Sequence, residues 1–176
     1  AGFYMNEDPD APNYDPEHKI IRSLFNGSRG PLLRKATAID WAGDPMDQVE
    51  GRFVAVHGER NWEEMLEHFA DYTDVIGDHP SNLVATALGF NAYALTGEAK
   101  YRDWVLEYVD RWMSDTKKNG GILPDNIGPN GVIGEHREGQ WWGSLYGWNH
   151  YQGFNIMYHG MVVAAECAQL LSGDSR

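Results

Sequence analysis

The chain has 176 residues, of which 42% are hydrophobic and 12% aromatic, so it is long and apolar enough to bury a core in one globular domain. Its formal net charge of −12 argues against nonspecific binding of nucleic acid, which requires basic patches. No segment approaches the roughly 20 consecutive apolar residues of a membrane span, and the single cysteine, Cys167, excludes an internal disulfide and is expected to be buried.

Residues 1–15 are acidic and interrupted by proline, and we predict an irregular segment there. The following region, residues 18–39, contains five lysine and arginine side chains and no acidic residue. Such a run can form a local cationic surface on an acidic protein and attract an anionic ligand. A solvated helix face with its capping residues is the alternative interpretation.

Apolar residues at helical spacing predict helices over most of the chain. The predicted ranges are 16–27, 31–43, 61–77, 81–97, 98–121 and 155–173. The clearest amphipathic stripe lies in the fifth range, where apolar and aromatic residues recur at helical period: Tyr101, Trp104, Val105, Tyr108, Val109 and Trp112. The only strand-like pieces are short and lie near residues 51–58. These patterns predict an all-α domain spanning residues 1–176.

A short motif recurs at the ends of two predicted helices. Thr96-Gly97-Glu98 aligns with Ser172-Gly173-Asp174, and the first copy leads into a long helix. We therefore predict a repeat of inner helix, turn and outer helix, and a chain that stops inside a later unit. The missing C-terminal part of the same polypeptide, or a second chain, would then cover an apolar face of the last helix. That face is expected to contain Met157, Met161, Val162 and Ala165.

Residues 119–154 form a predicted loop that is far longer than ordinary connections, and loops of this length are usually functional. Its last part, GQWWGSLYGWNHYQGF, mixes aromatic residues with glycines at neither helical nor strand spacing. Pyranose rings stack their C–H faces on Trp and Tyr, and their hydroxyls need polar partners. We predict a sugar-binding wall with Trp141 and Trp142 as stacking residues. The alternative is that the aromatics form core, as Trp148 and Phe154 are expected to do in either case.

The sequence LTGEAKYRDWVLEYVDRW, placed between a small-residue helix and a Gly-rich loop, resembles the (α/α) toroids of glycan-active enzymes. These include heparinase-II-like and alginate-lyase-like polysaccharide lyases and several glycoside hydrolases. The resemblance covers about residues 60–176 and is one of architecture. It implies helical hairpins of an incomplete toroid with loops lining a substrate cleft, and a secreted or periplasmic protein that degrades an acidic polysaccharide or oligosaccharide.

The resemblance also implies a chemistry, β-elimination from a uronate-containing glycan. Such lyases neutralise the substrate carboxylate, remove the C5 proton and protonate the leaving oxygen. By residue type, His150 would be the base, Tyr146 or Tyr151 the acid, and Asn149 or Arg137 the group that neutralises the carboxylate.

Further substrate contacts are expected outside the aromatic segment. His18 and Arg22 lie one helical turn apart in the predicted first helix and would bind carboxylate or sulfate groups. Asn126, in the long loop, would bind a sugar hydroxyl.

Two other functions remain open from the sequence. A glycoside hydrolase would need two carboxylates across the scissile bond, for which Asp40, Asp44, Asp125 and Glu135 are candidates. A helical module without catalytic activity could use the aromatic loop to bind a glycan or a protein. The histidines show no metal-ligand spacing, and no phosphate loop, nucleophile elbow or dinucleotide fingerprint occurs, so we predict neither a metal nor a cofactor.

Overall fold

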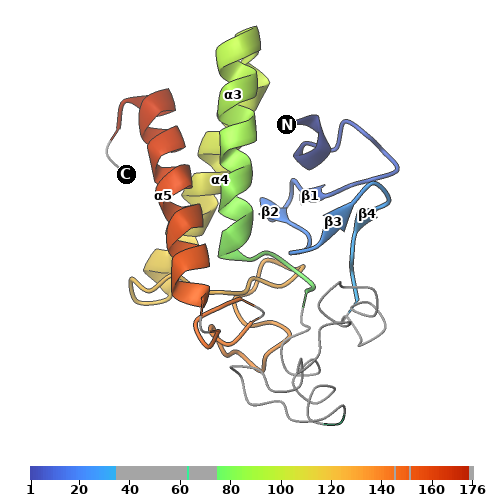
Figure 1. Ribbon diagram of the computed structural model, residues 1–176, viewed down its shortest axis with the longest axis vertical. Coiled ribbons are helices and arrows are strands. Elements are labelled where there is room, and N and C mark those ends of the chain that lie inside the picture. The colour runs from blue at the N-terminus through green and yellow to red at the C-terminus, as the bar shows by residue number, and fades with distance from the viewer. Residues whose placement is uncertain (35–62, 64–74, 145, 151, 175–176) are drawn as a thin grey trace, which may run out of the picture.

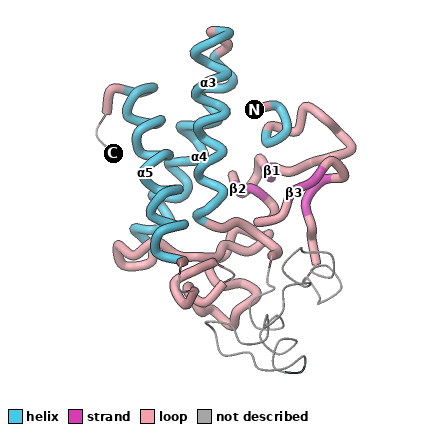
Figure 2. Tube along the Cα trace, viewed as in Figure 1, coloured by secondary structure: helices cyan, strands magenta, loops and turns pink. Residues whose placement is uncertain are grey.

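The computed structural model describes residues 1–34, 63, 75–144, 146–150 and 152–174. Within these residues, the helical part consists of α3 (Thr86–Thr96), α4 (Ala99–Lys118) and α5 (Gly153–Ser172), preceded by the 3-10 helix η3 (Pro80–Ala85). Helices α3 and α5 stand side by side with α4 behind them, and the N-terminal segments pack beside α4 (Figures 1 and 2). The loop between α4 and α5 lies across the lower end of the helices (Figure 1).

The N-terminal part contains strands, so the all-α prediction is wrong. A 3-10 turn, η1 (Gly2–Tyr4), is followed by β1 (Tyr14–Asp15), which pairs antiparallel with β2 (Ile20–Ile21). A second antiparallel pair joins β3 (Asn26–Gly27) to β4 (Gly30–Pro31). The described residues thus form a small mixed α/β arrangement and not a ring of helical hairpins. The predicted toroid is therefore not observed.

The predicted helix over residues 16–27 is replaced by these strands for local reasons. The Asp15 side chain accepts hydrogen bonds from the backbone N–H of Glu17 and of His18, which favours a turn over a helix. Lys19 follows with a φ of 60°, a left-handed conformation that ends any helical run. Ile20 and Ile21 are then both fully buried.

The later helices agree with their sequence patterns. The predicted stripe lies on α4, and its residues from Trp104 to Trp112 are buried, which confirms this part of the prediction. Tyr101, the first residue of the predicted stripe, is only half-buried. The predicted helix 81–97 divides into η3 and α3. Its tight first turn starts at Pro80, and the side chain of His79 caps it by accepting a hydrogen bond from the backbone N–H of Ser81.

The two copies of the short motif have the same geometry. Gly97 and Gly173 are both left-handed C-caps, with φ of 71° and 70°. Before each glycine, a hydroxyl donates to the carbonyl four residues earlier, at 2.8 Å for Thr96 and 2.7 Å for Ser172. The motif is therefore a real local repeat of one helix-ending structure.

The predicted apolar face of α5 is only partly open. Met157 is buried, whereas Met161 and Ala165 are exposed and Val162 is half-buried. Cys167 is buried as predicted, and burial raises the pKa of its thiol. Most of the predicted helices 31–43 and 61–77, and all of the strand-like residues 51–58, lie outside the described residues. Of the two predicted helices, the structure describes only residues 31–34, 63 and 75–77, and among these only Glu63 is helical.

The buried carboxylate of Asp78 connects the N-terminal strands to the helical part of the fold. It accepts hydrogen bonds from the backbone N–H of Ile21 at 2.9 Å, from Asn82 Nδ2 at 2.9 Å and from the Tyr108 hydroxyl at 2.9 and 3.0 Å. Its own backbone pairs with Ile127 in both directions. Asp78 therefore holds β2, η3, α4 and the long loop at one point.

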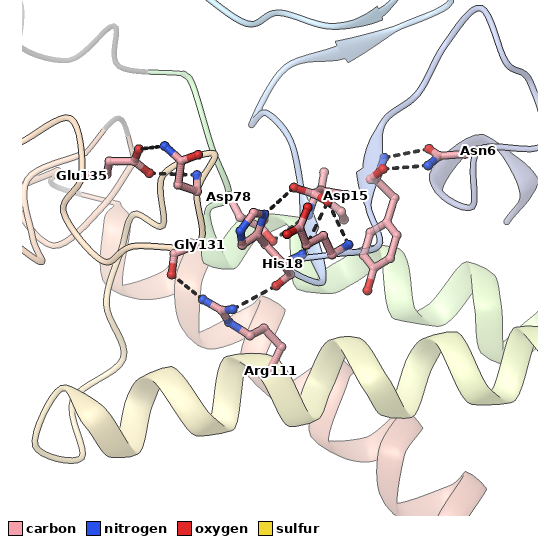
Figure 3. Close-up of polar contacts among 11 residues, drawn as sticks. Asn6, Asp15, His18, Asp78, Arg111, Gly131 and Glu135 are labelled. Atoms are coloured by element: carbon pink, nitrogen blue, oxygen red, sulfur yellow. Dashed lines mark hydrogen bonds and ion pairs between the residues drawn. The ribbon is translucent and has the colours of Figure 1, made fainter.

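Arg111 of α4 makes a second connection between distant segments (Figure 3). Its guanidinium donates to the carbonyl oxygens of His18 at 3.0 Å and Gly131 at 2.6 Å, while Nε contacts the Asp115 carboxylate at 2.6 Å. Asp115 is 2% exposed, so this ion pair is shielded from water. The contacts fasten the N-terminal hairpin and the long loop to the same helix.

Replacing Arg111 with methionine is expected to lower the free energy of unfolding by about 3 kcal/mol, because it leaves two carbonyls and a buried carboxylate without this donor. Urea titration of the whole protein measures the change. Arg102→Met is the matched control on the same helix, since its ion pair with Asp103 is exposed and should matter little. Equal stability of the two variants would contradict the connecting role of Arg111.

Candidate functional site

The aromatic loop is organised around the buried carboxylate of Asp125. Its Oδ2 accepts hydrogen bonds from the backbone N–H of Gly143 at 2.7 Å and of Trp148 at 2.8 Å. Its Oδ1 accepts from Asn126 Nδ2 at 2.9 Å and from the Ser144 N–H at 3.3 Å. One fully buried side chain thus fixes the backbone at Gly143, Ser144 and Trp148.

Two glycines allow the loop to close on this carboxylate. A Cβ on Gly147 would collide with the Asp125 carboxylate and the Ser144 hydroxyl. Gly143 has a φ of 96°, which side chains other than glycine rarely adopt. Glycine is therefore required at positions 143 and 147, because the loop backbone passes close to the Asp125 carboxylate there.

Three nitrogen atoms converge beside Gly143. A Cβ built on this residue would lie 3.0 Å from Arg137 Nη2, 3.0 Å from Gln140 Nε2 and 3.4 Å from Asn149 Nδ2. We call Arg137, Gln140 and Asn149 the donor cluster. One guanidinium and two amides thus lie near one point and carry N–H groups of the kind that bind a carboxylate or a sulfate. Gln140 Nε2 also donates to the Trp142 carbonyl at 2.9 Å.

Tyr146 and His150 lie next to each other in the same loop. Their rings meet edge to face with centroids 4.9 Å apart. Tyr146 has a φ of 57° and packs against buried Val75, which fixes the position of its ring. His150 Nδ1 accepts a hydrogen bond from the backbone N–H of Gln152 at 3.2 Å. In the neutral ring this contact assigns the hydrogen to Nε2, so His150 presents a donor.

Several aromatic side chains of the loop and of α5 are accessible to a ligand. Trp142 is 38% exposed, Trp148 is 38% exposed and Phe154 is 61% exposed. The expectation that Trp148 and Phe154 form core is therefore wrong, because both rings remain at the surface. Asp125 holds the backbone of Trp148, and the Trp148 Nε1–H donates to the Leu123 carbonyl. Trp141 is half-buried and meets Trp148 edge to face.

Arg137, Tyr146, Asn149 and His150 all lie in the long loop: Arg137 and Asn149 near Gly143, and Tyr146 against His150. Their roles toward a substrate stay predictions. Gln140 was missed, because nothing in its sequence context distinguishes it from a surface amide. Tyr151 lies outside the described residues.

The other predicted binding residues have different roles. His18 Nδ1 contacts the Asp15 carboxylate at 2.8 Å, and the backbone of Arg22 pairs with Asn13 and Gly77 in the N-terminal part. Their described contacts lie in the N-terminal hairpin and not in the aromatic loop. The Asn126 amide donates to Asp125 Oδ1 and to the Gln140 carbonyl, which makes it a support of the loop.

The carboxylates considered for glycoside hydrolysis are poorly suited to it. Asp125 is fully buried and accepts hydrogen bonds within the loop. Glu135 accepts hydrogen bonds from the backbone N–H and the side-chain amide of Asn130. Asp40 and Asp44 lie outside the described residues. Of the candidates within the described residues, Asp125 is buried and only Glu135 is accessible, so these two do not form an accessible pair.

Among the described residues, no group of three or more His, Cys, Asp or Glu side chains could hold a metal ion. No helix in the same residues is long and apolar enough to cross a membrane.

The described structure is a small mixed α/β domain with its candidate site on one long loop. Along its full length, residues 1–176, the chain matches the model of a family described as a domain of unknown function, DUF8034, and it belongs to that family. No curated protein and no solved structure matches the chain.

Proposed function

We propose that this domain binds a uronate-containing glycan at the aromatic loop and cleaves it by β-elimination. The observation that carries the proposal is the convergence of Arg137, Gln140 and Asn149 beside Gly143, next to the Tyr146–His150 pair. Hydrogen bonds from the donor cluster to a uronate carboxylate would stabilise the negative charge that develops when the C5 proton leaves. Trp142 would stack against a sugar face.

The tautomer of His150 changes its expected part in this reaction. Because Nδ1 accepts the Gln152 N–H, the neutral ring offers Nε2–H as a donor and not a lone pair as a base. His150 then adds a hydrogen bond to the substrate, and Tyr146 transfers the proton. Tyr146, entering the step as its phenolate, takes the C5 proton. The C5–H electron pair becomes the C4=C5 double bond, the C4–O bond breaks, and the leaving oxygen takes up that proton from Tyr146.

Product analysis tests the reaction. Incubation with polygalacturonate, alginate and hyaluronan is expected to release an unsaturated uronate from at least one of them, detected by its ultraviolet absorbance. New reducing ends without that absorbance would support a hydrolase instead. Binding without any product would support a binding module.

Two substitutions of His150 distinguish a hydrogen-bond donor from a general base at this position. His150→Gln keeps an N–H donor but cannot accept a C5 proton, so it should retain activity within about tenfold of the wild type, whereas His150→Ala should lose about 10²-fold or more. Tyr146→Phe should lose about 10²–10⁴-fold of kcat, as expected for a proton-transferring group. Trp142→Ala should raise KM more than it lowers kcat. Equal loss in the Gln and Ala variants would return the base role to His150.

A further inference from the structure

A second pocket adjoins the candidate site. It lies between η3 and the first turns of α5 and has a volume of about 440 Å³, within the range of small-molecule sites. The side chains lining it are Ser81, Val84, Gln152, Asn155, Ile156 and His159. The residues from α5 recur at helical spacing and therefore present one face to η3.

The pocket differs from the donor cluster in its charge. Among the described residues, no Asp, Glu, Lys or Arg side chain lines it, whereas the donor cluster contains Arg137. Its polar groups are a hydroxyl, two amides and an imidazole, which can both donate and accept hydrogen bonds. Val84 and Ile156 add an apolar wall. This chemistry fits a neutral polyhydroxylated ring, and it offers no cation for a carboxylate.

The imidazole ring of His79 orients the hydroxyl of Ser81. The backbone N–H of Ser81 donates to His79 Nδ1 at 3.1 Å, so this nitrogen carries a lone pair. Ser81 Oγ lies 2.9 Å from the same atom and directs its hydrogen toward it. Its oxygen lone pairs are then available to a ligand hydroxyl. Burial lowers the pKa of His79 to about 4, which keeps the ring neutral and this orientation unchanged near neutral pH.

The pocket and the candidate site are continuous along the chain. Gln152, which lines the pocket, donates its backbone N–H to His150 Nδ1, and His150 contacts Tyr146. One backbone hydrogen bond thus connects a residue of the pocket to the Tyr146–His150 pair.

We propose that this pocket is a subsite for an uncharged sugar, so that the preferred ligand is a glycan in which a uronate adjoins a neutral sugar. The assignment of the neighbouring unit as a uronate rests on the proposed function. The neutral subsite itself rests on the pocket.

The test uses the whole protein and two monosaccharide probes that differ only at C6, methyl β-glucoside and methyl β-glucuronide. At millimolar concentrations, the glucoside is expected to shift the NMR side-chain resonances of Asn155 and His159, and the glucuronide those of Arg137 and Asn149. A double variant, Asn155→Ala with His159→Ala, should abolish the response to the glucoside only. Both residues are exposed on α5, and Gln169→Ala, exposed on the same helix, is the matched control.

The outcomes distinguish the two proposals. Loss of the glucuronide response in Arg137→Gln, with no glucoside response in the wild type, would overturn the neutral subsite and leave the proposed function standing. A glucoside response that depends on Asn155 and His159, with no glucuronide response, would support the subsite and contradict the uronate site. No response to either sugar would contradict both.

An oligosaccharide that alternates glucuronate with N-acetylglucosamine then tests whether one ligand spans both places. Its affinity is expected to fall by about fivefold or more in the Asn155/His159 double variant and in Arg137→Gln, because each loses hydrogen bonds to one unit. Unchanged affinity in the double variant would show that the pocket does not hold the neutral unit.

Discussion

Replacing Asp78 with asparagine should stabilise the protein relative to the wild type as the pH rises from about 4 to about 7. Burial raises the pKa of Asp78 to about 7, against an ordinary value near 4. The folded protein therefore binds a proton that the unfolded chain releases within this window. The stabilisation is fully present below the unfolded pKa and is lost as the pH rises through the folded pKa.

The size of the effect follows from the difference between the two pKa values. It amounts to about 4 kcal/mol across the window, since each pKa unit corresponds to about 1.4 kcal/mol. Asparagine has nearly the same shape as protonated aspartate and does not titrate. Its one oxygen can accept only part of the hydrogen bonds that Asp78 accepts, and its Nδ2 can donate to the Tyr108 oxygen, so any loss from this exchange is independent of pH. Urea titrations of both proteins at several pH values give the difference in free energy of unfolding.

His79 should produce the opposite slope. Burial lowers the pKa of His79 to about 4, so its contribution is present above the unfolded value of about 6.5 and is lost as the pH falls toward 4. In the wild type the two neighbouring residues largely compensate each other between pH 4 and 6.5. In Asp78→Asn the slope due to His79 becomes visible. Asp103→Asn, an exposed position on α4, is the control for loss of one carboxylate. Parallel pH profiles of wild type and Asp78→Asn would contradict the raised pKa.

A single methyl group at Gly147 is expected to abolish ligand binding at the aromatic loop. Its Cβ would collide with the Asp125 carboxylate, so either the loop or the carboxylate must move. Movement breaks the hydrogen bonds from Gly143 and Trp148 and displaces the donor cluster from its common point. Leaving buried donors and a buried carboxylate unpaired should also cost on the order of 3 kcal/mol of folding free energy.

The matched control is Gly27→Ala. A Cβ on Gly27 meets only the Gly30 carbonyl oxygen at 4.0 Å, so this variant should keep both stability and binding. Binding of a uronate oligosaccharide by calorimetry and the free energy of unfolding in urea provide the two measurements. If Gly147→Ala binds as the wild type does, the aromatic loop does not form the site.

The sequence alone determined the parts of the protein that depend on local periodicity. The stripe from Trp104 to Trp112 predicts α4 because apolar residues at helical spacing can be buried together only in a helix. The glycines at 97 and 173 mark helix ends because a left-handed C-cap favours glycine. The composition of the aromatic loop predicts a sugar-binding surface, which stays a prediction.

Local patterns were misleading where side chains compete with the backbone or where burial is decided by distant segments. Residues 16–27 have apolar residues that suit a helix. The Asp15 carboxylate, however, accepts hydrogen bonds from the next backbone N–H groups, and Lys19 is left-handed, so a turn between two strands is favoured. Trp148 and Phe154 are apolar enough to be core, yet the loop anchored on Asp125 leaves them exposed.

Which residues lie together in the candidate site can be learned only from the tertiary structure. The sequence indicates neither that Asp125 is buried and accepts hydrogen bonds from the loop nor that Arg137, Gln140 and Asn149 meet beside Gly143. These contacts join residues that no helical or strand period relates, so local propensity carries no information about them. They form because a buried carboxylate must be satisfied by donors, and the donors available to Asp125 are the N–H groups of a glycine-rich loop that folds over it.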